Sequence, residues 1–137
     1  MNFLLDTNVI SEPRKRQPNP NVVRWLKANS VGQMFISSIT IAEISMGRYK
    51  ATDKAVEEAL TAWLEYRIKP RYAGQILPIT SQIAEVWGQL FSSRSVTQES
   101  GLVFDLFLAA TAMVHDLSLV TRNTKHFDSL PIHIINP

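Results

Sequence analysis

Short apolar runs separated by helical patterns are the feature that most constrains how this chain folds. Runs with the length and composition of buried strands occupy residues 3–5, 34–36, 119–121 and 132–135. Short runs of this kind are typical of strands that are covered on both faces. No two consecutive runs are joined by a hairpin turn signal. The pattern therefore predicts an α/β fold with a mainly parallel central sheet.

The stretches between these runs carry apolar residues at helical spacing. They predict helices over residues 21–28, 41–49, 55–68, 83–91 and 103–115. The faces that carry Trp63, Leu64, Trp87, Leu90 and Phe91 are expected in the core, and any apolar patch left over would mark a partner surface. A length of 137 residues is typical of one compact unit. We therefore expect a single domain over residues 1–137.

Composition narrows the chemistry that is available to the chain. It contains no cysteine, which excludes disulfides, thiolate zinc sites, iron–sulfur clusters and a cysteine nucleophile. Any bound metal ion must be held by oxygen or imidazole. The formal net charge of +2 is a weak basic excess that permits binding to a polyanion without requiring it.

The N-terminal segment and the apolar stretches predict where the protein acts. Residues 1–6 have no basic region and reach a charge almost at once, unlike a secretory signal. The longest nearly apolar stretch, residues 106–114, is far shorter than the roughly 18 to 20 residues of a membrane-spanning helix. We expect a cytoplasmic protein with no membrane role.

The acidic residues are informative through their surroundings. Most of the twelve lie among polar neighbours and are expected on the surface; examples are Asp53, Glu57, Glu58, Glu65, Glu85 and Glu99. Three lie among apolar residues instead: Asp6, Glu43 and Asp105. A carboxylate in apolar surroundings costs several kcal/mol unless it is hydrogen-bonded, paired or metal-bound.

Each of these three carboxylates also has a purely structural explanation. Asp6, at the end of a strand, fits an Asx-turn or a helix cap. Residues 40–43 match the S/T-x-x-E capping box, so that Glu43 would simply help to begin a helix. Asp105 falls in the first turn of the helix predicted over residues 103–115, where the helix dipole favours an acid.

The positions of the three carboxylates weaken these separate explanations. Asp6 ends a strand, Glu43 follows a strand by a few residues, and Asp105 opens a helix. In a parallel sheet these places lie on the same edge, at the carboxyl ends of the strands. Three carboxylates meeting there would repel one another unless a divalent cation neutralised them, and oxygen ligands favour Mg²⁺ or Mn²⁺.

Four segments resemble the ordered motifs of the PIN domain, most closely those of the VapC and FitB type of toxin ribonuclease. They are LLDTNVIS at residues 4–11, SSITIAEI at 37–44, DLFLAATA at 105–112 and LVTRN at 119–123. The motifs extend over nearly the whole chain. The resemblance implies a PIN-like three-layer α/β/α sandwich.

The resemblance also implies an activity and a set of partners. The activity is that of an endoribonuclease dependent on Mg²⁺ or Mn²⁺, which cleaves RNA phosphodiester bonds with a metal-activated water and acts as the toxin of a toxin–antitoxin pair. The implied partners are an RNA substrate, a cognate antitoxin and a second copy of the chain, with a higher assembly when the antitoxin is bound. DNA would be reached only through the antitoxin.

The motifs assign roles to individual residues. The resemblance makes Asp6, Glu43 and Asp105 catalytic residues and metal ligands, and it places Asn123 at the fourth catalytic position, where FitB-like members have Asp. This departure leaves open whether one or two ions bind, and Asp128 is a substitute candidate that also fits a surface acid. It keeps one alternative open: a catalytically weak PIN-like domain that binds RNA or a protein.

The remaining candidates belong to the substrate side. Thr7, Arg14, Arg122 and Lys125 are expected to contact the substrate phosphate, although Arg14 also fits a solvated loop. Asn8 is expected to fix the turn after the first strand, and an acid is missing at this position for a phospho-acceptor site on Asp6. His115 and His126 are expected at the surface or at helix ends.

Overall fold

The computed structural model describes residues 1–93 and 100–137, and it has a five-stranded sheet at its centre. The strands are β1 (Phe3–Leu5), β2 (Met34–Ser37), β3 (Ile76–Leu77), β4 (Ser118–Val120) and β5 (Ile134–Ile135). Their order across the sheet is β3-β2-β1-β4-β5, and every neighbouring pair is parallel. The predicted parallel sheet is confirmed. β3 was not predicted, because a strand of two half-buried residues leaves no readable pattern.

Helices connect the strands. They are α1 (Thr7–Ile10), α2 (Pro20–Ala28), α3 (Ser38–Lys50), α4 (Lys54–Trp63), α5 (Lys69–Arg71), α6 (Ser81–Ser92) and α7 (Ser100–His115). A π-helical turn, Leu64–Ile68, joins α4 to α5. All five predicted helices are present, with ends that differ by a few residues.

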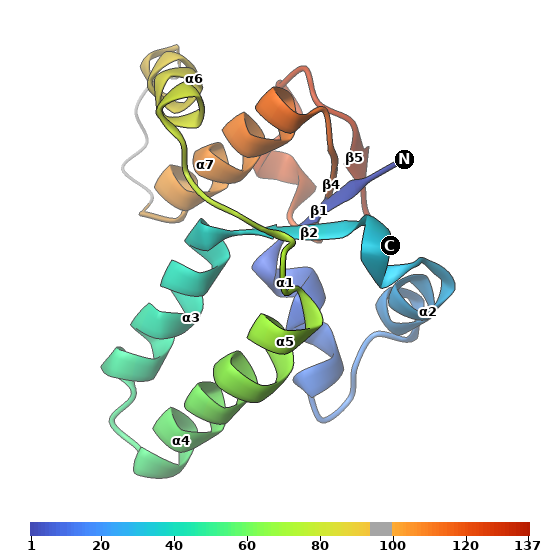
Figure 1. Cartoon of the computed structure of the whole chain (residues 1–137), viewed down its shortest axis with the longest axis vertical. Coiled ribbons are helices and arrows are strands. Elements are labelled where there is room, and N and C mark those ends of the chain that lie inside the picture. Colours follow the sequence, from blue (N-terminus) through green and yellow to red (C-terminus); the bar gives the residue numbers. More distant parts are fainter. Residues whose placement is uncertain (94–99) are drawn as a thin grey trace.

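Alternating side chains of the strands divide the core into two layers. Phe3 and Leu5 of β1 pack into a cluster with α1, α2, α3 and the π-helical turn, whereas Leu4 packs into a second cluster with α6 and α7. Figure 1 shows α6 and α7 on one side of the sheet and α3, α4 and α5 on the other. This is a three-layer α/β/α sandwich, as predicted.

The starts of two helices differ from the prediction. α3 begins at Ser38, and the Ser37 hydroxyl caps it by accepting a hydrogen bond from the Ile39 N–H at 3.0 Å. The expected capping box at residues 40–43 is therefore wrong, because Ser37 at the end of β2 caps the helix first. α7 begins at Ser100, so Asp105 lies in its second turn rather than its first.

The exposure of most acidic side chains agrees with the prediction from the sequence. Asp53, Glu57, Glu58, Glu65 and Glu85 are exposed, while Glu99 lies outside the described residues. Leu64 and Leu90 are buried as expected, and Trp63, Trp87 and Phe91 are half-buried at the edges of the two clusters. Among residues 1–93 and 100–137, no helix combines the length and the apolar character needed to cross a membrane.

Candidate active site

Asp6 is fixed at the carboxyl end of the central strand β1. It is buried, with 6% of its surface exposed. Its Oδ1 accepts a hydrogen bond from the Thr7 N–H at 2.7 Å, and its Oδ2 accepts one from the Thr121 hydroxyl at 2.7 Å. Asp6 does cap α1, as its structural explanation requires. The second contact ties the same carboxylate to the residue that follows the neighbouring strand β4.

Glu43 is joined to this carboxylate through Thr7. The Thr7 hydroxyl donates a hydrogen bond to Glu43 Oε1 at 3.0 Å, while the Thr7 N–H donates to Asp6. Glu43 lies in the second turn of α3, which follows β2, the strand next to β1. Thr7, which was predicted to contact a phosphate, therefore holds two carboxylates in the free chain.

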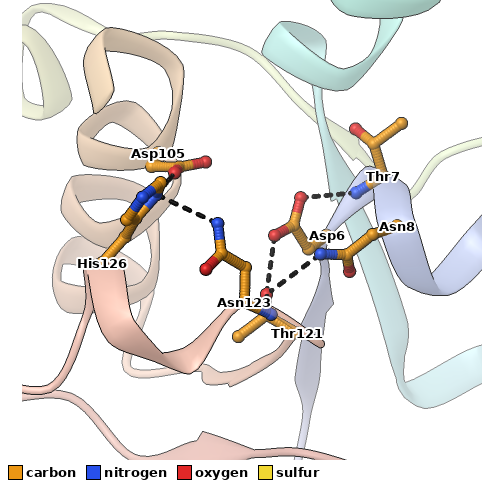
Figure 2. Close-up of polar contacts among 7 residues, drawn as sticks. All are labelled: Asp6, Thr7, Asn8, Asp105, Thr121, Asn123 and His126. Carbon is orange, nitrogen blue, oxygen red and sulfur yellow. Dashed lines mark hydrogen bonds and ion pairs between the residues drawn. The ribbon is translucent and has the colours of Figure 1, made fainter. Parts of the chain in front are cut away.

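Asp105 approaches the same edge from α7. Its Oδ2 contacts Nδ1 of His126, and that nitrogen lies 3.1 Å from Nδ2 of Asn123. The Asn123 N–H donates to the Thr121 hydroxyl at 3.0 Å. Figure 2 shows the result, a row of polar contacts that runs from Asp105 to Asp6.

Burial raises the pKa of all three carboxyl groups. For Glu43 the pKa rises to about 7, mainly through loss of hydration and further through the charges of Asp6 and Asp105, against the hydrogen bond from Thr7. Burial also raises the pKa of Asp6 and that of Asp105, which the bonds from Thr121 and His126 respectively oppose. The three groups thus share one region of unfavourable negative charge.

The donors at this edge fit a hydrated divalent cation. In the described part of the chain, no three acidic or histidine side chains form a ready-made metal group. The carboxylates come instead as the pair Asp6 and Glu43, linked by Thr7, and as Asp105 beside His126. Mg²⁺ usually keeps several waters and takes only one or two carboxylates directly. A cation of this kind would also relieve the repulsion between the carboxylates.

The turn after β1 is locked to the segment after β4. Oδ1 of Asn8 accepts a hydrogen bond from the Arg122 N–H at 3.2 Å, and Nδ2 of Asn8 lies 3.5 Å from the Thr121 hydroxyl oxygen. The prediction that Asn8 fixes the turn is confirmed.

The predicted basic residues lie in two different places. Arg122 and Lys125 are exposed on either side of Asn123, and the Arg122 guanidinium donates to Asn136 Oδ1 at 3.0 Å. Arg14 lies elsewhere, with its guanidinium carbon 4.3 Å from the centre of a Trp63 ring. Arg122 and Lys125 therefore lie near Asn123 in the chain, with the Arg122 guanidinium bound to C-terminal residues, whereas Arg14 lines a groove next to α2.

Two site residues were missed or misplaced from the sequence. His126 was expected at the surface or at a helix end, but it is half-buried and contacts Asp105. Asn123 and His126 are three residues apart around the 3₁₀ turn Thr124–His126, so their side chains share one side of the turn. Thr121 lies inside the motif at residues 119–123, but the hydrogen bonds that its hydroxyl makes with Asp6 and Asn123 are seen only in the structure. Asp128, the substitute acid, is exposed.

Comparison with known proteins gives the family. The family model of the PIN domain matches residues 3–132. Over 135 residues the chain is 37% identical to Toxin FitB from Neisseria gonorrhoeae, which covers 98% of this chain and 97% of that protein. It is 31% identical over 135 residues to VapC ribonuclease Y4jK from Sinorhizobium fredii, with coverage of 98% and 96%.

Solved structures agree with this match. The crystal structure of FitAcB from Neisseria gonorrhoeae has a TM-score of 0.85 at 35% identity and covers 98% of this chain and 97% of that chain. A structure of FitAB bound to the IR36 DNA fragment has a TM-score of 0.83 at 33% identity, with coverage of 98% and 94%. A toxin–antitoxin complex from Klebsiella pneumoniae has a TM-score of 0.67 at 29% identity, with coverage of 98% and 96%. The predicted PIN-like fold is confirmed, and the chain belongs to the PIN-domain family.

Proposed function

We propose that this chain is a metal-dependent endoribonuclease and the toxin of a toxin–antitoxin pair. The observation that carries the proposal is the convergence of Asp6, Glu43 and Asp105 on one edge of the sheet, where burial raises all three pKa values and repulsion by neighbouring carboxylates further raises those of Asp6 and Glu43. Such clusters of perturbed carboxyl groups are typical of catalytic sites. Relatives named as a toxin and as a VapC ribonuclease support the assignment.

In this proposal Asp6, Glu43 and Asp105 hold Mg²⁺ or Mn²⁺. The ion, when bound, supplies charge neutralisation at the phosphate and lowers the pKa of a water molecule. The protein supplies the geometry. Thr7 and Thr121 fix Asp6 by donating one hydrogen bond to each of its oxygens. A carboxylate whose two oxygens are both held in place presents its remaining lone pairs in a fixed direction.

The other residues act on the substrate. Arg122 and Lys125 flank Asn123 on the exposed rim and are suited to hold phosphates of the RNA. The Asn123 amide oxygen can face an ion or one of its waters, but as a neutral group it adds no charge to the site. We therefore assign Asn123 a positioning role at the fourth catalytic place.

An RNA cleavage assay with added Mg²⁺ or Mn²⁺ tests the enzyme. We expect wild-type cleavage that EDTA abolishes and that Asp6→Asn or Asp105→Asn removes. Asp128→Asn is the matched control, because it removes an exposed acid that lies five residues after Asn123. This variant should cleave RNA normally. Retention of RNA with no cleavage under either ion would instead support the binding domain.

A groove beside α2 is our candidate for the antitoxin. It has a volume of about 1090 Å³, and its lining includes Arg14, Lys27, Trp63, Tyr66, Arg67 and Arg71. We call it the basic groove, because four cations and no acid are among its lining residues. Its aromatic rings offer apolar contact, so it fits an acidic segment with apolar side chains. Its partner in this proposal is the cognate antitoxin, through which any DNA would be reached.

A second copy of the chain is the other proposed partner. Large apolar residues are exposed along α3 and α4: Met46, Tyr49 and Val56. Exposed apolar residues that gather on one surface favour association. We propose a homodimer, which light scattering after gel filtration tests; a monomer at micromolar concentration would contradict it.

A further inference from the structure

A second cavity lies at the amino-terminal ends of β4 and β5, away from the carboxylate edge. It has a volume of about 240 Å³, and residues from the end of α7, the start of β4 and the segment before β5 line it. One of these residues, Ser118, is the first of β4, whereas Thr121 follows the last residue of that strand. Three residues of strand separate the two positions by about 10 Å. The cavity is therefore distinct from the candidate active site.

The polar side of this cavity is electronegative. The Asp116 carboxyl group lines it and is exposed to solvent. α7 ends at His115, so the partial negative charge at the carboxyl end of the helix adds to that of Asp116. Of the described residues that line the cavity, none is a lysine or an arginine. A positively charged ligand would complement this side.

The backbone at Asp116 does not by itself explain an acid at this position. Asp116 has a φ of 52°, in the left-handed region. The Leu117 N–H donates to the Ala112 carbonyl at 2.9 Å and closes the end of α7. Glycine or asparagine would serve such a turn at least as well as aspartate. The carboxylate is therefore available for a role in the cavity.

Ser118 offers a ligand a hydrogen-bond acceptor. Its Oγ lies 2.9 Å from Nδ1 of His133, which also lines the cavity. A hydroxyl group has one proton and two lone pairs, so Ser118 Oγ keeps at least one lone pair whichever of the two atoms donates. Ser118 is only 7% exposed, which places it at the inner end of the cavity, whereas Asp116 lies at the rim. Two acceptors are thus present at different depths.

We propose that this cavity binds an alkylguanidinium group, as carried by an arginine side chain or by a free guanidino compound. The planar guanidinium has donors in a fixed fork, which can reach the Asp116 carboxylate and Ser118 Oγ together. The apolar lining, which includes Met113, Leu117 and Ile132, suits the methylene stem of such a group. The inference does not depend on the proposed nuclease activity, because it uses neither the carboxylate edge nor a metal ion.

Titration of the ¹⁵N-labelled full chain with butylguanidinium, followed by NMR, tests the proposal. We expect saturable shifts of the amide signals of residues 112–118, 132 and 133. Butylurea is a neutral molecule of nearly the same shape, and it should bind at least about tenfold more weakly because it lacks the charge. Methylguanidinium should also bind more weakly, since it has no stem to bury. The absence of saturable shifts, or shifts confined to Asp6, Glu43 and Asp105, would overturn the proposal.

Asp116→Asn is the variant that removes the charge from the rim. Asparagine adopts the left-handed conformation as readily as aspartate, so the turn after α7 should be kept. The affinity for butylguanidinium should fall by about tenfold or more. Asp128→Asn, the matched control, removes an exposed acid that does not line the cavity and should bind within about twofold of wild type. Equal affinities in the wild type and in Asp116→Asn would overturn the proposal.

A capped peptide separates the two sources of the ligand. Acetyl-Gly-Arg-Gly-amide presents the guanidinium on a peptide backbone, as a partner protein would. Binding as tight as that of butylguanidinium would support an arginine side chain of a partner. Binding of butylguanidinium without binding of the peptide would support a free guanidino compound. Both results uphold the cavity as a guanidinium site, and a chain that gives either result but cleaves no RNA would contradict only the proposed nuclease.

Discussion

The carboxylate edge and the basic groove are built in opposite ways. At the carboxylate edge, residues from separate segments meet through hydrogen bonds of 2.7 to 3.0 Å, as between Asp6, Thr7, Glu43 and Thr121. The walls of the basic groove are formed instead by ring and cation side chains, among them Lys27 of α2, Arg67 of the π-helical turn and Arg71 of α5. Precise polar contacts suit chemistry, whereas a broad charged surface with aromatic rings suits a macromolecular partner. The difference predicts that cleavage and partner binding are separable by substitution.

The largest difference between the effect on RNA cleavage and the effect on antitoxin binding is expected from Asp6→Asn. Asparagine keeps the size of the side chain and an oxygen that can accept the Thr7 N–H, so the fold should survive. The charge of a central catalytic group is lost, and RNA cleavage should fall by about 10²- to 10⁴-fold. Antitoxin affinity, measured by calorimetry, should not change. Cleavage within twofold of wild type would remove Asp6 from the mechanism.

Arg67→Glu in the basic groove should have the opposite and smaller effect: it should weaken antitoxin binding and leave RNA cleavage unchanged. Arg67 is exposed and lines the groove, so reversing its charge should leave the fold intact and repel an acidic segment. Antitoxin affinity should fall by roughly 10- to 100-fold, with cleavage of RNA unchanged. Arg24→Glu on the exposed side of α2 is the control, since Arg24 does not line the groove. Equal losses in both variants would contradict the assignment of the groove.

This contrast also explains what the sequence could predict. Four of the strands and the longer helices could be predicted because apolar residues recur at fixed periods. Asp6, Glu43 and Asp105 could be predicted because acids are rare among apolar neighbours. The start of α3 was not predicted correctly, because Ser37 and Thr40 can both cap a helix. Ser37 is the cap because β2 ends there and α3 begins at the next residue. Motif order located the site without fixing these details.

The roles of residues that depend on the packing of distant segments could not be predicted from the sequence. Arg14 follows the first motif, yet it packs over Trp63, a residue of a distant helix, and so belongs to the basic groove. His126 joins Asp105 only because the 3₁₀ turn Thr124–His126 and the second turn of α7 are neighbours. No local pattern encodes either contact, because each depends on how separate elements pack.

Metal binding at the carboxylate edge should depend on pH through Glu43. Its pKa of about 7 in the free chain means that an ion must displace a proton at lower pH. Apparent Mg²⁺ affinity should therefore rise by up to about tenfold per pH unit below 7 and level off above it. Calorimetry in buffers of different ionisation enthalpy measures the released proton.

Glu43→Gln is the variant that isolates this effect. It should bind Mg²⁺ more weakly at pH 8 and show a flatter dependence between pH 6 and 8, since glutamine has no proton to release. The basic groove contains no acid among its lining residues, so antitoxin binding should not share this dependence. An unchanged slope in Glu43→Gln would assign the released proton to another group.

The smallest expected effect is on the stability of the metal-free chain. Burial raises the pKa of Glu43 from 4.5 to about 7, so the folded state holds this proton more tightly than the unfolded state does. The resulting stabilisation is fully present below pH 4.5 and is lost as the pH rises through about 7. In EDTA, the thermal midpoint of the wild type relative to Glu43→Gln should therefore fall between pH 5 and 8, and saturating Mg²⁺ should reverse the fall. If the thermal midpoint of the wild type instead rose relative to that of Glu43→Gln as the pH increased in EDTA, the ionised Glu43 would be stabilised by other groups of the metal-free protein. The carboxylate edge would then need no cation to balance its charge.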